Sequence, residues 1–256
     1  MHVLRLECRA EERDRLIAEL WERGTLGVIE EDLPGGGAAL RAFFDQPFDA
    51  PERGRWELAD DRDWVAVAQS QWEPVLAGEK FYLVPSWRAD PTPPGRLRLE
   101  MQPGSACGTG WGPATQLALV AMESRLRPGM AVLDLGTGSG ILAVAAMLLG
   151  AGRVYACDID REAAGAARER FRSEGIQVGL FAGSLRAVRA GAVDFVVANI
   201  NAETLTSLAP EIERILKPGG GAALTGFPAR NLEAVRAAYG GRGTVLEKDE
   251  WRAIVW

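Results

Sequence analysis

Two patterns of apolar and polar positions divide the chain. In the first pattern, residues 3–9 alternate as a half-buried strand does, and residues 11–23 carry apolar side chains on one face of a helix. Two more apolar runs follow at 25–30 and 38–44, joined by the turn sequence Pro-Gly-Gly-Gly at 34–37. This order predicts a small α+β domain, βαββ, of the ferredoxin-like kind.

In the second pattern, apolar runs alternate with helical stretches. Nearly continuous apolar runs are typical of parallel strands that helices cover on both faces. The expected strands are 81–84, 97–101, 131–135, 153–157, 177–181, 194–199, 222–225 and a closing antiparallel pair at 243–247 and 251–256. The expected helices are 113–126, 139–149, 161–172, 202–216 and 231–239. We therefore expect an α/β domain with a Rossmann-like, seven-stranded sheet.

The two patterns are separated by a polar stretch. Residues 45–55 are rich in Pro, Asp and Arg, which is typical of a linker, and residues 61–72 have the spacing of a helix that Pro74 closes. We predict an N-terminal domain at 1–55 and a linker segment with a helix at 56–76. The seven-stranded domain would then comprise residues 77–256.

A glycine-rich turn follows the strand expected at 131–135. Gly136, Gly138 and Gly140 leave no side chain between the backbone and a ligand, and the helix after the turn directs free N–H groups toward it. A dinucleotide fingerprint requires glycine at its sixth position, where this chain has Ile141. The turn therefore predicts a nucleotide site that does not bind NAD.

Two carboxylates flank this turn. Asp134 lies two residues before Gly136, where it would repel a pyrophosphate but hold a cationic ligand. Asp158 ends the next strand, 22 residues after Gly136, where an acid accepts hydrogen bonds from ribose hydroxyls. S-adenosylmethionine has an ammonium, a sulfonium and a ribose, so it is the expected cofactor. Asp134, Gly136, Gly138 and Asp158 are the candidate cofactor-binding residues.

Composition narrows the chemistry further. The three cysteines are odd in number and widely spaced, which argues against a disulfide framework and against a CxxC metal site. His2 is the single histidine, so we expect neither a zinc centre nor a histidine-based triad. No apolar run approaches the roughly 20 residues of a membrane span, and the first residues lack the features of a signal peptide. We expect a cytoplasmic protein without a metal or a membrane partner.

The acidic excess lies in the first pattern. Residues 1–60 hold 14 Asp or Glu and 8 Arg, whereas the remaining residues hold 21 of each sign. An acidic surface argues against direct binding of nucleic acid and favours a basic protein partner. A solvated acidic surface without a partner is the competing interpretation.

With these motifs in order, the chain resembles the class I methyltransferases and, more closely, the bacterial family that methylates large-subunit ribosomal protein eleven. The resemblance extends over essentially the whole chain. Its motifs are Val84-Pro85-Ser86-Trp87, Pro103-Gly104-Ser105-Ala106-Cys107-Gly108-Thr109-Gly110, Leu133-Asp134-Leu135-Gly136-Thr137-Gly138-Ser139-Gly140, Asp158-Ile159-Asp160 and Val197-Ala198-Asn199-Ile200. The resemblance implies N-methylation of lysine or α-amino groups on a basic ribosomal protein by S-adenosylmethionine. The family's four cofactor-binding positions correspond to Thr115, Gly136, Asp158 and Asn199. We expect a monomer.

The family's substrate loop departs from its usual sequence here. The loop residues are Gly108, Thr109, Gly110 and Trp111. The family's Phe, His and first Thr are replaced by Cys107, Gly112 and Ala114. Because these positions would lie over the methyl group, two alternatives stay open. One is a methyltransferase of a different protein or small molecule, and the other is a cofactor-binding relative without turnover.

Methyl transfer is an in-line displacement, so the enzyme must hold a neutral amine about 3–3.5 Å from the methyl group in a dry pocket. We assign the catalytic role to Asn199, whose side-chain oxygen would orient the amine, with Asn201 next in line. Each of these residues also has a purely structural interpretation. In that interpretation Asn199 only caps the following helix, and Asp134 only accepts hydrogen bonds from backbone N–H groups. Asp158 would cap its helix, although Asp160 is better placed for that.

Overall fold

The computed structural model describes residues 2–9, 12–25, 27–33, 37–44, 46–48, 54–58, 73–101 and 112–256. By their internal contacts, residues 1–72 and 73–256 form two compact units, unit 1 and unit 2. Each unit is described by itself. Cys107, the substrate-loop residues at 108–111 and the helix expected at 61–72 lie outside the described residues.

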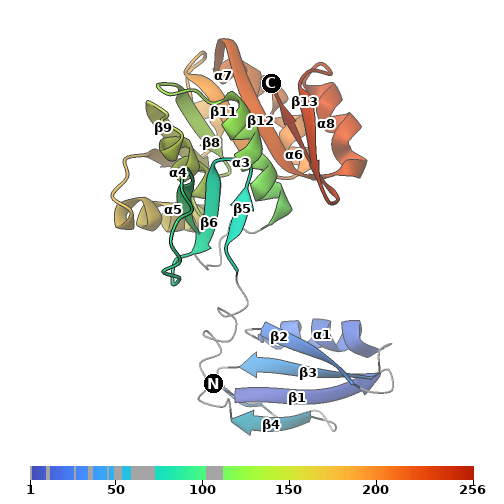
Figure 1. Ribbon diagram of the computed structural model, residues 1–256. Coiled ribbons are helices and arrows are strands. Elements are labelled where there is room, and N and C mark those ends of the chain that lie inside the picture. The colour runs from blue at the N-terminus through green and yellow to red at the C-terminus, as the bar shows by residue number, and fades with distance from the viewer. Residues whose placement is uncertain are drawn as a thin grey trace. The chain divides into compact units, whose positions relative to one another are not determined.

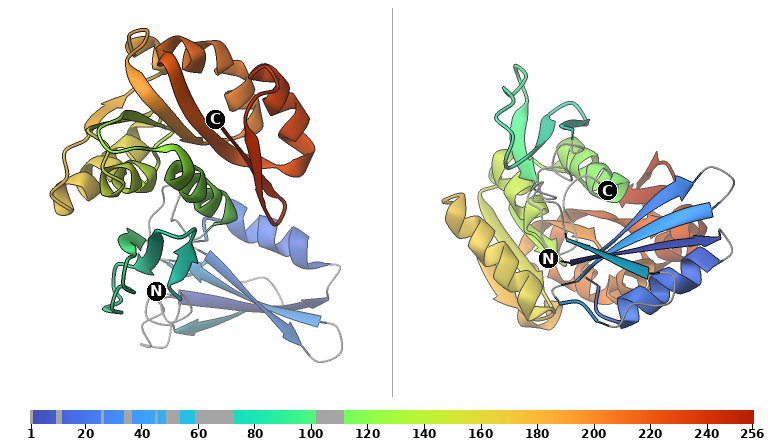
Figure 2. Two further views of the ribbon diagram at one scale, coloured as in Figure 1. Left: turned by 45° about the horizontal axis from the view of Figure 1, so that its top comes forward. Right: turned by 90° about the horizontal axis from the view of Figure 1, so that it is seen from below.

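Unit 1 contains the expected βαββ order. Its elements are β1 (His2–Arg9), α1 (Arg13–Glu22), β2 (Gly27–Leu33), β3 (Gly37–Phe44) and β4 (Gly54–Leu58). The strand order is β2-β3-β1-β4, and every neighbouring pair is antiparallel, as in a ferredoxin-like sheet. Helix α1 lies along the sheet (Figure 2), where Leu20 packs against Leu4, Leu6 and Leu40. Because side chains alternate between the two faces of a strand, β1 places Leu4, Leu6 and Cys8 in this core.

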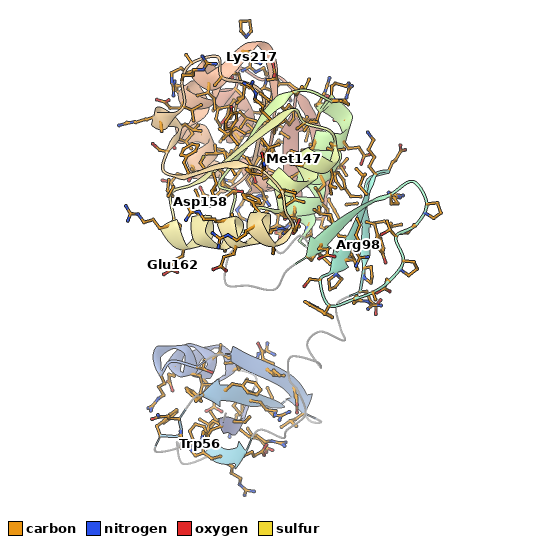
Figure 3. All side chains as sticks on the ribbon, turned by 90° about the vertical axis from the view of Figure 1, so that its left-hand side faces the viewer. Trp56, Arg98, Met147, Asp158, Glu162 and Lys217 are labelled. Atoms are coloured by element: carbon orange, nitrogen blue, oxygen red, sulfur yellow. The ribbon has the colours of Figure 1, made fainter. Side chains whose placement is uncertain are left out.

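The prediction of a linker at 45–55 is wrong at its C-terminal end, because β4 begins at Gly54 and pairs with β1. Trp56, labelled in Figure 3, donates its indole N–H to the carbonyl of Phe48 at 2.9 Å. Its ring also packs edge-on against Phe44 and Phe48, with centroids 5.6 and 5.2 Å apart. Aromatic contacts thus hold a strand too short for a hydrophobic pattern to reveal.

The described part of unit 2 has the expected seven-stranded sheet, in the order β10-β9-β8-β11-β12-β14-β13. Its strands are β8 (Ala131–Leu135), β9 (Arg153–Asp158), β10 (Gly179–Ala182), β11 (Val193–Asn199), β12 (Leu216–Pro228), β13 (Thr244–Lys248) and β14 (Trp251–Val255). Strand β14 is antiparallel to both of its neighbours, β12 and β13, whereas the pairs among β10, β9, β8, β11 and β12 are parallel. The predicted fold class is confirmed.

Helices cover both faces of this sheet (Figure 1). The helices are α3 (Pro113–Arg125), α4 (Ile141–Leu148), α5 (Arg161–Ser173), α6 (Ala202–Ser207), α7 (Ala209–Ile215) and α8 (Leu232–Ala238), with short 3₁₀ turns at Leu185–Ala187 and Ala229–Asn231. Val132 and Val197 pack with α3, α4 and α5, whereas Leu133 and Val196 pack with α6, α7 and α8. This alternation explains why the strands are apolar on both faces. None of the described helices is long and apolar enough to span a membrane.

Unit 2 differs from the sequence prediction at three places. The single helix expected at 202–216 is two helices, because Pro210 begins α7 and cannot donate a backbone hydrogen bond to α6. The strand expected at 222–225 is longer, since β12 starts before the glycines at 219–221 and its register with β11 shifts there. The strands expected at 81–84 and 97–101 form a separate, three-stranded sheet together with a strand that was not expected. Its order is β5 (Val75–Ala77), β6 (Phe81–Pro85) and β7 (Leu97–Met101).

Candidate active site

A cavity of about 820 Å³ opens at the carboxyl ends of β8, β9, β11 and β12. This is the edge at which open α/β sheets bind ligands. Asp158 marks this edge in Figure 3, whereas the labelled Lys217 lies at the opposite end of the sheet, where it forms an ion pair with Asp194. Four predicted site residues line the cavity: Gly136, Gly138, Asp158 and Asn199.

The glycine turn is folded back onto strand β9. The backbone N–H groups of Gly136 and Thr137 donate to the carbonyl of Cys157 at 2.9 and 3.0 Å. Gly136 has φ +70°, and a Cβ atom there would overlap the side chain of Ile200. Gly138 also has positive φ, at +51°. A side chain at position 136 would therefore strain the backbone and fill the turn, so glycine is required.

Asp158 holds the turn from the side of β9. One carboxylate oxygen accepts the N–H of Gly138 and the other accepts the N–H of Asp160, both at 3.0 Å. The cap of α5 is Asp160, which accepts the N–H of Glu162 at 2.8 Å. The capping interpretation of Asp158 is therefore wrong. Next to Asp158, Ile159 lines the cavity with 81% of its surface exposed, which is unusual for a large apolar side chain.

Asp134 lies beneath the turn and is completely buried. Its Oδ2 atom accepts the hydroxyl of Thr137 at 2.6 Å and the N–H of Ala143 at 3.0 Å, so Asp134 is a structural acceptor, as one interpretation expected. Its Oδ1 atom has no hydrogen-bond partner in the described residues. Burial raises the pKa of this carboxyl to about 7, against the opposing effect of the Thr137 hydrogen bond. Asp134 is not among the residues that line the cavity.

Asn199 and Thr115 meet although they are 84 residues apart. The side-chain amide of Asn199 donates to the Thr115 hydroxyl at 3.1 Å, and Thr115 is buried in the third position of α3. This bond commits the amide nitrogen and fixes the orientation of the group, and the oxygen accepts no hydrogen bond from the described residues. Asn201, not Asn199, caps α6, since it accepts the N–H of Thr204 at 2.8 Å. The capping interpretation of Asn199 is therefore wrong.

The family model described as ribosomal protein L11 methyltransferase (PrmA) matches residues 40–256. The chain belongs to this family. The ribosomal protein L11 methyltransferase of Thermus thermophilus is 38% identical over 246 residues, which cover 95% of this chain and 92% of the relative. The enzyme of that name from Bordetella bronchiseptica is 36% identical, covering 98% of this chain and 97% of its own. A solved ribosomal protein L11 methylase from Lactobacillus delbrueckii subsp. bulgaricus is 31% identical with a TM-score of 0.65, and the match covers 72% of this chain and 97% of the other.

Membership of the L11 methyltransferase family makes the chain an enzyme, and S-adenosylmethionine is its cofactor. Both predictions are confirmed. The residues present fit this cofactor: the turn at Gly136 has no room for a side chain, and the carboxylate of Asp158 lies at the cavity wall. The resemblance placed Asn199 and Thr115 in one site, and their hydrogen bond joins them in the structure.

Most residues that line the cavity were not predicted, among them Ile159, Gly226 and Trp251. Ile159 follows Asp158 directly, so its place after a candidate ribose-binding acid was an available signal. Gly226 and Trp251 come from β12 and β14, and no motif marks them. Of the positions at which this chain departs from the family loop, the structure describes Gly112 and Ala114, and Ala114 lines the cavity. Gly112 is the N-cap residue of α3, and no atom of the described residues lies within 4 Å of a Cβ atom placed there.

Proposed function

We propose that this chain transfers methyl groups from S-adenosylmethionine to lysine side chains or α-amino groups of ribosomal protein L11. The observation that carries the proposal is the hydrogen bond between Asn199 and Thr115, which frees one amide oxygen at the edge of the cavity beside the glycine turn. The relatives named as ribosomal protein L11 methyltransferases support the choice of substrate. A ribosomal substrate also agrees with the expected cytoplasmic location.

The cofactor residues in this proposal act mainly through the backbone and through carboxylates. The turn at Gly136 and Gly138 would approach the cofactor closely, and Asp158 would accept hydrogen bonds from its ribose hydroxyls. Asp134 would supply a negative charge beneath the turn for the ammonium group, and Thr115 would fix the amide of Asn199. When bound, S-adenosylmethionine supplies the electrophilic methyl group of its sulfonium.

Asn199 is the proposed catalytic residue. Its side-chain oxygen accepts an N–H of the incoming amine and thereby directs the nitrogen lone pair. A lysine ammonium, with a solution pKa of about 10.4, must release its proton first, and apolar neighbours such as Leu135 and Ile200 favour the neutral amine. No strong base is needed, since orientation and exclusion of water provide the acceleration.

We assign substrate docking to the acidic N-terminal domain predicted at 1–55, which β4 extends to Leu58, and catalysis to the domain predicted at 77–256, which β5 extends back to Val75. The linker predicted at 56–76 is shortened at both ends accordingly. L11 is the basic partner in this proposal, and the protein acts as a monomer without binding nucleic acid directly. The acidic excess of residues 1–60 supports this assignment, because opposite charges accelerate the encounter of two proteins.

The test combines cofactor binding with turnover. Purified protein is titrated with S-adenosylmethionine in a calorimeter and then incubated with labelled cofactor and undermethylated L11. We expect heat of binding and label in L11. Asp158→Asn should weaken cofactor binding by about tenfold or more, because it removes a charged acceptor. Asp249→Asn is the matched control and should leave the binding unchanged. Asp249 is exposed between β13 and β14, does not line the cavity and has φ +52°, which Asn also adopts. Cofactor binding without labelled L11 contradicts the substrate assignment, and absence of cofactor binding contradicts the whole proposal.

The altered family loop favours a second candidate, a methyltransferase of a different acceptor or a cofactor-binding relative without turnover. Ala114 lines the cavity where the family has Thr, and Gly112 stands where the family has His. If the double variant Gly112→His, Ala114→Thr methylates L11 and the parent does not, the second candidate is correct. Equal activity of parent and variant favours the first.

A further inference from the structure

Two glycines enclose the residue that follows Asn199. In the strand order β8-β11-β12, Gly136 follows β8 and Gly226 lies in β12, so the two glycines flank the end of β11. Both have positive φ, at +70° and +95°, and the atoms nearest to a Cβ placed at either one belong to Ile200 or Asn199. Side chains at positions 136 and 226 would take the space of Ile200, so this residue lies wedged between the two neighbouring strands.

The side chain of Ile200 packs against the glycine turn. A Cβ atom at Gly136 would overlap the Cγ2 methyl of Ile200 and would lie 3.9 Å from its Cβ atom. Ile200 also packs against the core formed with α6, α7 and α8, and it lines the cavity. The Cγ2 methyl therefore occupies the place that a side chain of residue 136 would have, and it separates the end of β11 from the turn.

The backbone of Ile200 is held on the other side by β12. Its N–H donates to the carbonyl of Thr225 at 3.0 Å. A Cβ atom at Gly226 would lie 2.6 Å from the nitrogen and 2.5 Å from the carbonyl oxygen of Ile200. The pairing of β12 with β14 shifts register between Thr225 and Phe227, so Gly226 is a bulge residue. The turn limits the side chain of Ile200, and β12 limits its backbone.

These contacts determine where Asn199 lies. Its amide donates to the Thr115 hydroxyl at 3.1 Å, which orients the group. The same bond does not fix how far Asn199 lies from the glycine turn. That distance depends on the next residue, Ile200, because its methyl meets the turn while its peptide is bonded to β12. Orientation and distance are thus controlled by different residues.

We propose that Ile200 is a positioning residue that sets the distance between the glycine turn and Asn199. This inference rests on the proposed function, in which the turn holds the methyl donor and Asn199 holds the amine. The two reacting atoms must be about 3–3.5 Å apart, and a misplacement of about 1 Å can cost about 100-fold in rate. The Cγ2 methyl is the spacer between the two groups.

The test compares Ile200→Val with Ile200→Leu, which separate shape from volume. Val keeps the Cγ2 methyl and loses only the end of the longer branch, whereas Leu keeps the volume but has no methyl on its Cβ atom. Both stay apolar, so exclusion of water is maintained. A side chain that only filled the core would rank the variants by retained apolar volume, with Leu above Val. A spacer ranks Val above Leu.

Ile212→Leu is the matched control. Ile212 is completely buried in the same core and does not line the cavity. Each variant is assayed for the single-turnover rate of methyl transfer to L11 at saturating cofactor, for cofactor affinity by calorimetry and for its melting temperature.

We expect Ile200→Leu to lower the single-turnover rate by about tenfold and Ile200→Val to stay within about twofold of the wild-type rate. The cofactor affinity of both should change by less than about threefold, because the hydrogen bonds of the turn to β9 and to Asp158 remain. Ile212→Leu should keep the wild-type rate even where its melting temperature falls.

A double-mutant cycle tests the contact itself. Gly136→Ala places its Cβ atom on the Cγ2 methyl of Ile200, and Ile200→Leu removes that methyl. Gly136→Ala should therefore cost at least about threefold less cofactor affinity in the Ile200→Leu background than in the wild-type background. The strain of alanine at φ +70° persists in both backgrounds, so the recovery should be partial.

Three results would overturn the inference. They are a rate for Ile200→Leu equal to or above that of Ile200→Val, a loss of cofactor affinity as large as the loss of rate, and additive losses in the cycle. If the wild-type protein binds the cofactor but labels no L11, the proposed substrate fails instead. The cycle then decides whether Ile200 spaces the turn, because it needs cofactor binding and no turnover.

Discussion

The two ends of the cavity are built in different ways. The cofactor end comes from one short stretch, residues 134–143, with Asp158 beside it, and most of its hydrogen bonds involve backbone N–H groups. The acceptor end of the proposed function draws on distant elements: Asn199 of β11, held by Thr115 of α3, and the lining residue Trp251 of β14. In the proposed function, backbone shape recognises the methyl donor, whereas side chains present the acceptor.

The largest effect should come from the cofactor end. Gly136→Ala adds a Cβ atom that overlaps Ile200, at a backbone conformation of φ +70° that alanine avoids. We expect a loss of cofactor affinity of at least about 100-fold, since the turn must shift away from β9, and a lower melting temperature. Calorimetry with S-adenosylmethionine and thermal unfolding measure the two effects.

Gly165→Ala is the control for this substitution. Gly165 lies within α5 and has open space at its Cβ position, so alanine should raise helix stability slightly and leave the cofactor affinity as it is. If Gly136→Ala binds the cofactor as tightly as the control does, the turn does not approach the cofactor and the comparison of the two ends is wrong.

Asn199→Ala should affect turnover much more than cofactor binding. It removes the only acceptor oxygen that this proposal gives to the amine, so kcat should fall by about 100-fold. Cofactor affinity should fall much less, because the turn and Asp158 remain. Single-turnover methylation of L11 and calorimetry provide the two numbers. Asn231→Ala serves as the control, since Asn231 precedes α8, makes no side-chain capping bond and does not line the cavity. An equal loss in both measurements would assign Asn199 to the cofactor end.

Thr115→Val should have a smaller effect than Asn199→Ala. It keeps the shape of the side chain but removes the hydroxyl that accepts the Asn199 amide, so the amide is free to rotate. We expect kcat to fall about tenfold. In a double-mutant cycle, Thr115→Val should have no further effect once Asn199 is Ala. Independent losses from the two substitutions would show that Thr115 acts on the cofactor directly.

The sequence predicts the cofactor end better than the acceptor end for a physical reason. The acids and glycines at 134–140 are contiguous, so their spacing alone reports the turn, and Asp158 follows at a fixed distance because a helix and a strand intervene. Trp251 lines the cavity because β14 is inserted antiparallel beside β12, and no local pattern encodes that pairing. Similarly, the sheet was predicted from apolar runs, whereas β4 was missed because aromatic contacts of Trp56 hold it.

The smallest effect that we expect is a pH dependence at the cofactor end. Burial raises the folded-state pKa of Asp134 to about 7, from an ordinary value of 3.8. Between these values the folded chain binds the proton more tightly than the unfolded chain, so the free energy of unfolding falls as the pH rises from 3.8 toward about 7 and then levels off. Asp194 acts in the opposite sense and below this window, because Lys217 lowers its pKa.

Thermal unfolding between pH 5 and 8 measures this effect, which should be a loss of about 5–10 °C, the shift that 2–3 kcal/mol produces in a domain of this size. Asp134→Asn should abolish the slope, since an amide does not titrate. S-adenosylmethionine should reduce the slope of the wild-type protein, because a cation near Asp134 favours the ionised form. If the cofactor leaves the slope unchanged while it binds, Asp134 is only a structural acceptor for Thr137 and Ala143, and the cofactor end recognises its ligand without this charge.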